Sequence, residues 1–109
     1  MTQVALVTGA AQGLGLSIAN RLFAAGYAVV ITDLSLERAQ AAADRLDPSG
    51  QRSLALQLDV ASKADFEAAL TAVLARWGAL HVAVNSAAMT RTTPVMQISP
   101  EEFDRVMSL

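Results

Sequence analysis

The feature that most constrains the fold is a glycine-rich stretch, residues 8–15, with the pattern T-G-x-x-x-G-x-G. An apolar run precedes it, and apolar residues at helical spacing (Leu14, Ile18, Leu22) follow it. A strand that ends in a glycine turn and restarts as a helix directs backbone N–H groups and the positive end of the helix dipole at one point. The glycines would allow unusual dihedral angles, close approach of a ligand and close packing of helix on strand. The stretch therefore predicts a phosphate-binding turn.

The rest of the sequence alternates short apolar runs with helical patterns. Strands buried on both faces are predicted at residues 4–8, 28–32, 54–58 and 81–84. Helices are predicted from Leu14 to Gly26, over 36–46 behind a Ser35 cap, from Ser62 to Gly78, and from Ser99 onward. With right-handed crossovers this order predicts an α/β fold, in which residues 1–109 form one domain. The expected architecture is an incomplete Rossmann-type doubly wound parallel sheet of four strands, in the order 3-2-1-4, with helices on both faces.

Three local features of the sequence lead to further structural predictions. Ser62 and Asp65 have the spacing of a capping box at the start of a helix. Residues 86–98 are expected to form a polar loop, which would leave the strand at 81–84 as an unpaired apolar edge, prone to aggregation. His81, the only histidine, lies within that strand pattern and is expected to be structural, so no metal site is predicted.

Polar residues or glycine end all the predicted strands, and the carboxyl ends of parallel strands share one rim of a sheet. Asp33 follows the second strand, about 20 residues after Gly13, where a carboxylate can accept hydrogen bonds from both ribose hydroxyls of an adenosine. It would also repel a 2′-phosphate, and Gln12 brings no opposing charge, so NAD is predicted over NADP. Arg38 is the nearest cation that argues for NADP. A turn or capping aspartate is the alternative interpretation.

Two further strand ends carry candidate residues. Asp59 and Val60 follow the third strand, where they would either contact an adenine ring or form an ordinary turn. Asn85 and the small residues after it follow the fourth strand, where a flat cofactor could approach the backbone. A tight exit from the strand would explain the small residues equally well.

Together these motifs resemble the short-chain dehydrogenase/reductase family. The matching segments are residues 8–15, Asp33, Asp59 with Val60, residues 85–88, and the helix start at 99–103. The resemblance implies a Rossmann fold, a nicotinamide cofactor and an oxidoreductase that transfers hydride between an alcohol and a carbonyl. The cofactor-binding residues that it implies are Gly9, Gln12, Gly13, Leu14 and Gly15 at the pyrophosphate, Asp33 at the ribose, Asp59 and Val60 at the adenine, and Asn85 and Ala87 beside the fourth strand. The family usually has Asn-Asn-Ala-Gly at this last place, where Ser86 and Ala88 stand here.

The family's catalytic serine and Tyr-x-x-x-Lys pair have no counterpart in this sequence. Tyr27 is followed four residues later by Ile31, and Lys63 is preceded at that distance by Asp59. One helical turn must separate the pair for the ammonium to lower the pKa of the tyrosine. We therefore assign no catalytic residue and expect an N-terminal cofactor-binding part, truncated before the catalytic region and inactive alone. The intact parent is expected to be a homo-oligomer acting on a small alcohol or carbonyl compound.

Composition excludes several other classes. Eight basic and ten acidic residues with no basic cluster argue against nucleic acid or an acidic membrane as partner. The absence of cysteine is compatible with the reducing cytoplasm, and no apolar run approaches the ~18 residues of a membrane helix. Two other hypotheses stay open: a stand-alone nucleotide-binding regulatory module without enzymatic activity, and a methyltransferase-like domain, against which the glycine spacing argues.

Overall fold

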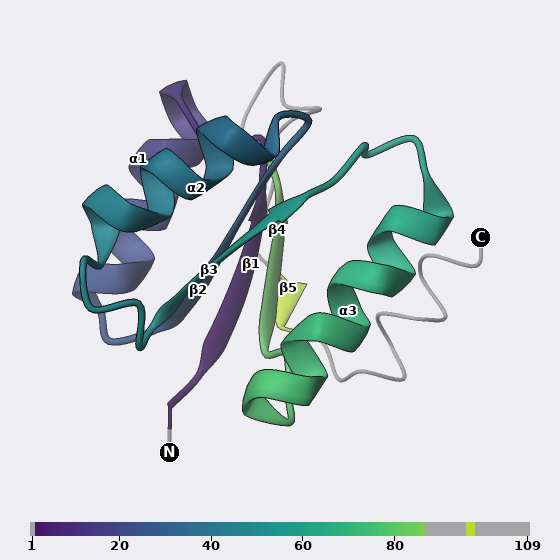
Figure 1. Cartoon of the computed structure of the whole chain (residues 1–109). Helices are drawn as coiled ribbons and strands as arrows, with labels where there is room; N and C mark the ends of the chain where they lie inside the picture. Colours follow the sequence, from purple (N-terminus) through teal and green to yellow (C-terminus); the bar gives the residue numbers. More distant parts are fainter. Residues whose placement is uncertain (1, 87–95, 98–109) are drawn as a thin grey trace.

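The computed structural model describes residues 2–86 and 96–97, and these residues form one twisted sheet with helices on both sides (Figure 1). The sheet contains, in the order β3-β2-β1-β4-β5, the strands β1 (Val4–Thr8), β2 (Ala28–Asp33), β3 (Ser53–Gln57), β4 (Val82–Asn85) and β5 (Met96–Gln97). The helices of the described part are α1 (Gly13–Ala24), α2 (Leu36–Leu46) and α3 (Lys63–Trp77). Strands β1 to β4 are parallel, and α1 and α2 cover one face while α3 covers the other.

The predicted architecture is confirmed. The parallel strands have the order 3-2-1-4, and the winding reverses between β1 and β4, as in a Rossmann-type doubly wound sheet. The predicted strands at 54–58 and 81–84 are each displaced by one residue from β3 and β4. The helix predicted from Ser99 onward lies outside the described residues.

The expectation of an unpaired edge at β4 was wrong. Strand β5 pairs with β4 in antiparallel register, with Val82 opposite Gln97 and Ala83 opposite Met96. This strand has two residues and therefore shows no period-two pattern that a sequence could reveal. It lies within residues 86–98, which were expected to be loop throughout.

Serine caps begin two of the described helices. The Ser35 hydroxyl accepts from the Arg38 N–H at 3.2 Å, and the Ser62 hydroxyl accepts from the Asp65 N–H at 3.1 Å. The predicted capping box is only half formed, because the Asp65 carboxylate accepts from the Asp59 N–H at 2.9 Å. Asp65 thus ties the loop after β3 to the first turn of α3 instead of closing the box.

The core has two layers, one on each face of the sheet. Small alanines on α1 and α2 let these helices pack closely on one layer, which includes Ala19, Ala39, Ala42, Ala43, Val7, Val29, Ile31 and Val84. The second layer lies under α3 and includes Val4, Leu6, Val30, Leu58, Phe66, Val73 and Leu80. All residues of β1 are buried, so its side chains alternate between the two layers. This double burial explains why the central strands have continuous apolar sequences.

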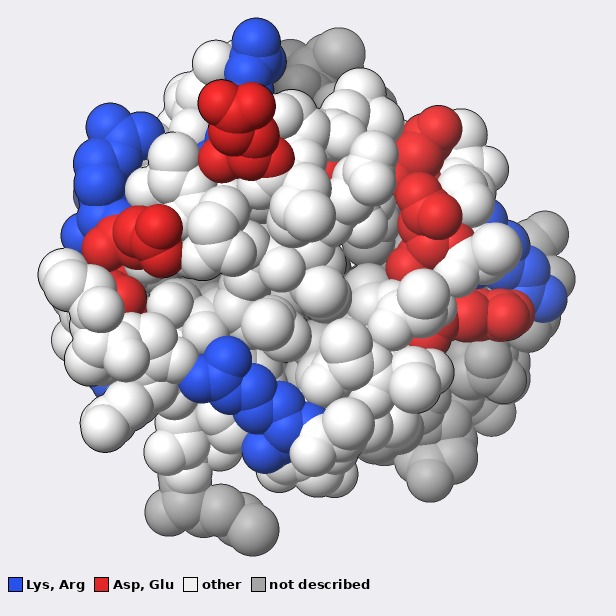
Figure 2. All heavy atoms as spheres, viewed as in Figure 1, with Lys and Arg blue, Asp and Glu red and all other residues white. Residues whose placement is uncertain are grey.

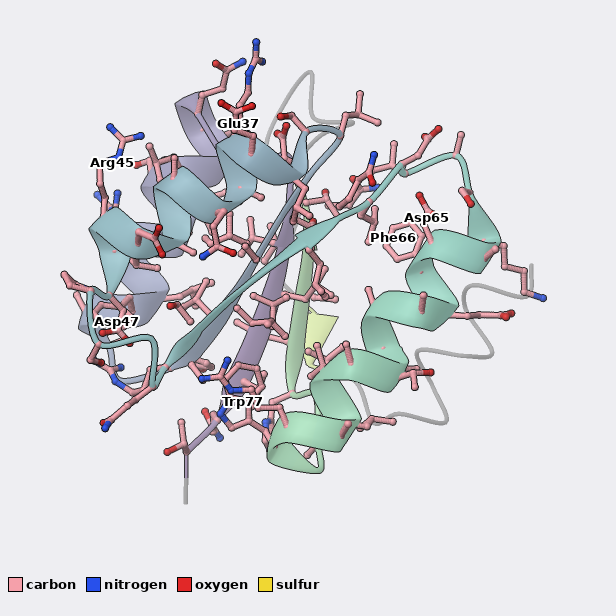
Figure 3. All side chains as sticks on the ribbon, viewed as in Figure 1. Glu37, Arg45, Asp47, Asp65, Phe66 and Trp77 are labelled. Atoms are coloured by element: carbon pink, nitrogen blue, oxygen red, sulfur yellow. The ribbon has the colours of Figure 1, made fainter. Side chains whose placement is uncertain are left out.

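A polar junction fastens the end of α2 to the end of α1. The Asp47 carboxylate accepts from the Ser49 hydroxyl at 2.6 Å and from the Arg52 N–H at 2.8 Å, and these bonds lower the pKa of Asp47 (Figure 3). The Arg52 guanidinium donates to the carbonyls of Phe23 and Tyr27 and lies 3.9 Å from the centroid of the Phe23 ring. Arg52 therefore satisfies carbonyls at the carboxyl end of α1.

His81 extends the pairing of β1 and β4 by one residue at their amino ends. Its backbone N–H donates to the Val4 carbonyl at 2.9 Å, and its Nδ1 accepts from the Val4 N–H at 2.9 Å. Val4 is fully buried, so its N–H depends on protein acceptors. The predicted structural role of His81 is confirmed by these bonds.

Replacing His81 by alanine is expected to lower the free energy of unfolding by about 1–3 kcal/mol, because a buried N–H loses its acceptor. His81→Asn is the matched control, since Oδ1 of asparagine can take the place of Nδ1 as an acceptor. Urea denaturation at neutral pH measures both variants, and the asparagine variant should lose clearly less. Equal losses in the two variants would show that packing, and not the hydrogen bond, accounts for the contribution of His81.

Candidate cofactor-binding site

The glycine turn joins β1 to α1 at the carboxyl edge of the sheet. Gly9 and Gly13 have φ values of 58° and 62°, in the left-handed region that favours glycine. The Ala10 N–H donates to the Thr32 carbonyl at 3.0 Å, so the turn is tied to the end of β2 as well as to β1. The turn is therefore held in place on the side of β2.

Gly15 brings the first turn of α1 against the turn that precedes it. A Cβ added at Gly15 would lie 2.5 Å from the Ser86 Oγ, 2.8 Å from the Gly9 carbonyl carbon and closer still to the Gly9 carbonyl oxygen. No real Cβ tolerates such contacts, so only glycine permits this separation. One of the glycines was expected to allow close packing of the helix on the strand, and Gly15 allows close packing of α1 on the turn and on Ser86.

The N-terminus of α1 differs from those of the other described helices. Its N-cap residue, Gln12, makes no side-chain capping bond, and its first turn contains no acidic residue. In contrast, α2 and α3 have serine caps and the acidic residues Glu37 and Asp65 in their first turns. The positive end of α1 therefore lacks an anionic or capping side chain from within the described residues. A phosphate group fits such a helix end.

Asp33 ends β2 and is half-buried. Its Oδ2 accepts from the Ser35 N–H at 3.1 Å, which is the bond expected of a turn aspartate. Its Oδ1 has no hydrogen-bond partner among the described residues. The turn and ligand interpretations therefore do not exclude each other: one oxygen orients the carboxylate, and the other is left to accept a hydrogen bond.

Asp59 and Val60 lie in the exposed connection between β3 and α3. The Asp59 Oδ1 accepts from the Ala61 N–H at 2.9 Å, so here too the turn interpretation holds for one oxygen. The Val60 side chain is 37% exposed. An apolar side chain in this place offers contact area to a ring.

Sequence reasoning missed Leu34 as a candidate. The large apolar side chains that the described part of the chain exposes are Leu14, Leu34, Leu36 and Val60. All four follow the carboxyl ends of β1, β2 or β3. Leu34 is the most exposed of them, at 66%, and directly follows Asp33. The available signal was a single apolar residue between a strand end and a helix cap, which has no periodicity to mark it.

At the end of β4 the polar side chains turn toward β1. The Thr8 hydroxyl donates to the Asn85 Oδ1 at 2.9 Å, and the Ser86 hydroxyl donates to the Thr8 carbonyl. Ser86 thus replaces the second asparagine of the family pattern with a side chain that bonds directly to β1. Ala87, the remaining candidate of this group, lies outside the described residues.

The charged side chains give no concentrated field on the visible surface. On the face shown in Figure 2, Lys and Arg are dispersed among Asp and Glu. Within residues 2–86 and 96–97, no group of three or more His, Cys, Asp or Glu side chains is placed to hold a metal ion. No helix in the same residues is long and apolar enough to cross a bilayer.

The strand order and the glycine turn define a doubly wound α/β protein of the Rossmann class. The family model described as short chain dehydrogenase matches residues 3–109. The chain therefore belongs to the short-chain dehydrogenase family.

Individual proteins similar to this chain include enzymes and ligand complexes. A 4-formylbenzenesulfonate dehydrogenase of Comamonas testosteroni is 46% identical over 105 residues, which cover 95% of this chain and 42% of the relative. A 3-ketoacyl-(acyl-carrier-protein) reductase from Brucella melitensis, solved with NADH, has a TM-score of 0.68 and 34% identity, covering 74% of this chain and 32% of its own. A variant of the actinorhodin polyketide ketoreductase, solved with NADPH, has a TM-score of 0.72 and 36% identity. The match covers 78% of this chain and 33% of the ketoreductase. The chain spans about two-fifths of the length of the curated relatives.

Proposed function

We propose that residues 1–109 form the dinucleotide-binding domain of an NAD-dependent oxidoreductase that transfers hydride between an alcohol and a carbonyl compound. One observation carries this proposal: the uncapped N-terminus of α1 lies directly behind the glycine turn, and Asp33 ends the adjacent strand. This arrangement supports an anion site and a ribose acceptor on the same edge of the sheet. Membership of the short-chain dehydrogenase family supports the reaction class.

The proposed contacts follow the edge of the sheet. The turn and first helical residues, Gly9, Gln12, Gly13, Leu14 and Gly15, would hold the pyrophosphate. Asp33 would bind the ribose through Oδ1, and Asp59, Val60 and Leu34 would surround the adenine. Asn85 and Ala87 would contact the part of the cofactor beside β4. The nicotinamide supplies the hydride acceptor or donor when the cofactor is bound.

The charge at the end of β2 supports NAD as the preferred cofactor. A second negative charge on the 2′-oxygen of the ribose would lie against the Asp33 carboxylate, where like charges repel. Similar proteins have been solved with NADH and with NADPH, so the family alone does not decide the preference. Arg38 follows Asp33 by five residues, and its exposed side chain is the nearest competing cation in the sequence.

No residue of this chain is proposed to transfer a proton. Hydride transfer, a small alcohol or carbonyl substrate and a homo-oligomeric assembly are proposed for the longer protein of which this chain would form part. The chain alone should bind the cofactor without turnover. A cytoplasmic location, with which the absence of cysteine is compatible, belongs to the same proposal.

Titration of the purified chain with NADH and NADPH, followed by nicotinamide fluorescence, tests the proposal. NADH should bind more tightly than NADPH, and Asp33→Asn should weaken NADH binding about 10- to 100-fold, because a charged hydrogen bond to the ribose is lost. Asp44→Asn is the matched control, since Asp44 is an exposed carboxylate of α2 that bonds only to Gln40 among the described residues. Its affinity for NADH should equal that of the unmodified chain.

The outcomes separate the parts of the proposal. Tighter binding of NADPH would contradict the preference for NAD while leaving the dinucleotide site intact. Failure of a folded chain to bind either nucleotide would contradict the site itself. Turnover of an alcohol by the chain alone would contradict the assignment of proton transfer to residues outside it.

A further inference from the structure

Ser86 occupies a place where three parts of the candidate site meet. It directly follows β4, and its hydroxyl donates to the carbonyl of Thr8, the last residue of β1. Its Oγ also lies in the space that a side chain on Gly15 would need, at 2.5 Å from the position of the absent Cβ. The end of β4, the end of β1 and the first turn of α1 therefore converge on one half-buried hydroxyl group.

The hydrogen bond to Thr8 fixes more than one atom. The Thr8 carbonyl and the Gly9 N–H belong to the same planar peptide group, which is trans, so they point in opposite directions. A donor that holds the carbonyl therefore also fixes the direction of the Gly9 N–H. Gly9 is the first residue of the glycine turn, and its left-handed backbone determines how the following residues leave the sheet. The Ser86 hydroxyl is thus bonded to the peptide group from which the turn begins.

Other hydrogen bonds tie the turn and the end of β1 to the neighbouring strands. The Ala10 N–H bonds to the Thr32 carbonyl, which ties the turn to β2. The Thr8 hydroxyl lies 2.9 Å from the Asn85 Oδ1 and 3.4 Å from the Val84 carbonyl, which ties β1 to β4. The Ser86 hydroxyl adds a side-chain bond to the main chain at the point where the turn begins.

We propose that Ser86 is a positioning residue of the cofactor site, which holds the glycine turn and the start of α1 in the geometry that receives the pyrophosphate. The proposal rests on the proposed function, since it concerns the affinity for a dinucleotide. Ser86 acts through the Thr8–Gly9 peptide and through the packing of its Oγ against Gly15. Its effect should therefore fall on the phosphates and spare the adenosine.

Comparison of ADP with adenosine as competitors of NADH tests this distinction, because ADP carries the two phosphates and adenosine carries none. In Ser86→Ala the affinity for ADP should fall about 5- to 10-fold, the effect of one lost hydrogen bond, while the affinity for adenosine stays unchanged. Thr71→Val is the matched control, because the Thr71 hydroxyl also donates to a backbone carbonyl, at 2.9 Å, but on the exposed side of α3. Neither affinity should change in that variant.

A second variant distinguishes loss of the hydrogen bond from misfolding of the alanine variant. Ser86→Cys keeps a small side chain and a weak S–H donor, so its ratio of ADP to adenosine affinity should fall by less than that of the alanine variant. Circular dichroism establishes that each variant is folded. Equal losses for ADP and adenosine, or no loss for either, would overturn the positioning role. If the unmodified chain does not bind NADH, the result contradicts the proposed function and not the positioning role of Ser86. The two hypotheses are therefore tested by different results.

Discussion

Gly15→Ala should abolish measurable cofactor binding and lower the free energy of unfolding, although the same change usually stabilises a helix. Alanine in place of glycine inside a helix contributes about 1 kcal/mol of stability. At position 15, however, the added Cβ would lie 2.5 Å from the Ser86 Oγ and against the backbone of Gly9. Relief requires α1 to move away from the glycine turn. Overpacking of this severity costs about 3 kcal/mol, so after the gain in helix propensity we expect a net loss of about 2 kcal/mol.

The movement of α1 would displace the N–H groups that we propose to face the pyrophosphate. Loss of one or two charge-assisted hydrogen bonds costs about 3 kcal/mol, so the affinity for NADH should fall about 100-fold. Thermal or urea denaturation and the fluorescence titration measure the two effects. Gly50→Ala is the control, because Gly50 has a φ of 72° but open space where its Cβ would be. It should lose about 1 kcal/mol of stability without any change in affinity.

A Gly15→Ala variant that is more stable than the unmodified chain would contradict the close packing of α1 on the turn. The sign of the change is therefore the decisive result.

Phe66→Ala should have the largest effect on stability alone. Phe66 is 7% exposed and projects from the first half of α3 toward the sheet, where it packs in the layer that contains Leu6, Val30 and Leu58 (Figure 3). Removal of a buried phenylalanine typically costs 3–5 kcal/mol, so we expect a loss of about 4 kcal/mol. Among the helices of residues 2–86, α3 alone covers this face, so α1 and α2 cannot move in to close the cavity.

Urea denaturation measures this loss, and Leu36→Ala is the control for removal of a large apolar side chain. Leu36 is 49% exposed at the start of α2 and should lose less than about 1 kcal/mol. Similar losses in the two variants would indicate that α3 does not pack on the sheet as described.

The order of the sheet and the position of the glycine turn could be predicted because several independent signals agree. The apolar run at residues 4–7, the glycines after it and the helical spacing from Leu14 point to one strand-turn-helix unit. Ser35 and Ser62 act as caps because a cap depends on residues within one helical turn. Most of the fold could therefore be predicted from interactions between residues that are close in sequence.

Features that depend on distant residues could not be predicted in the same way. Strand β5 has its partner in β4, and its two residues have no pattern of their own. The Asp65 carboxylate bonds to the N–H of Asp59 because the loop after β3 folds back, which no spacing rule indicates. The close approach of the Ser86 Oγ to Gly15 brings together residues from the two ends of the described sheet sequence, after β4 and after β1. Leu34 differs from other leucines only in its exposure, which is a property of the folded chain.

The contrast between α1 and the other described helices has a thermodynamic consequence. Helices α2 and α3 carry their own N-terminal acceptors, so one N–H of each first turn is bonded to a serine hydroxyl within the chain itself. The first turn of α1 has no such side chain, and a bound phosphate would supply the missing acceptor. The free energy of nucleotide binding and the stability of the first turn of α1 are then linked. Any stabilisation of this turn by the nucleotide contributes to the affinity of the nucleotide. A chain with a strong cap at position 12 would have a more stable α1 and, by the same linkage, a weaker hold on its cofactor.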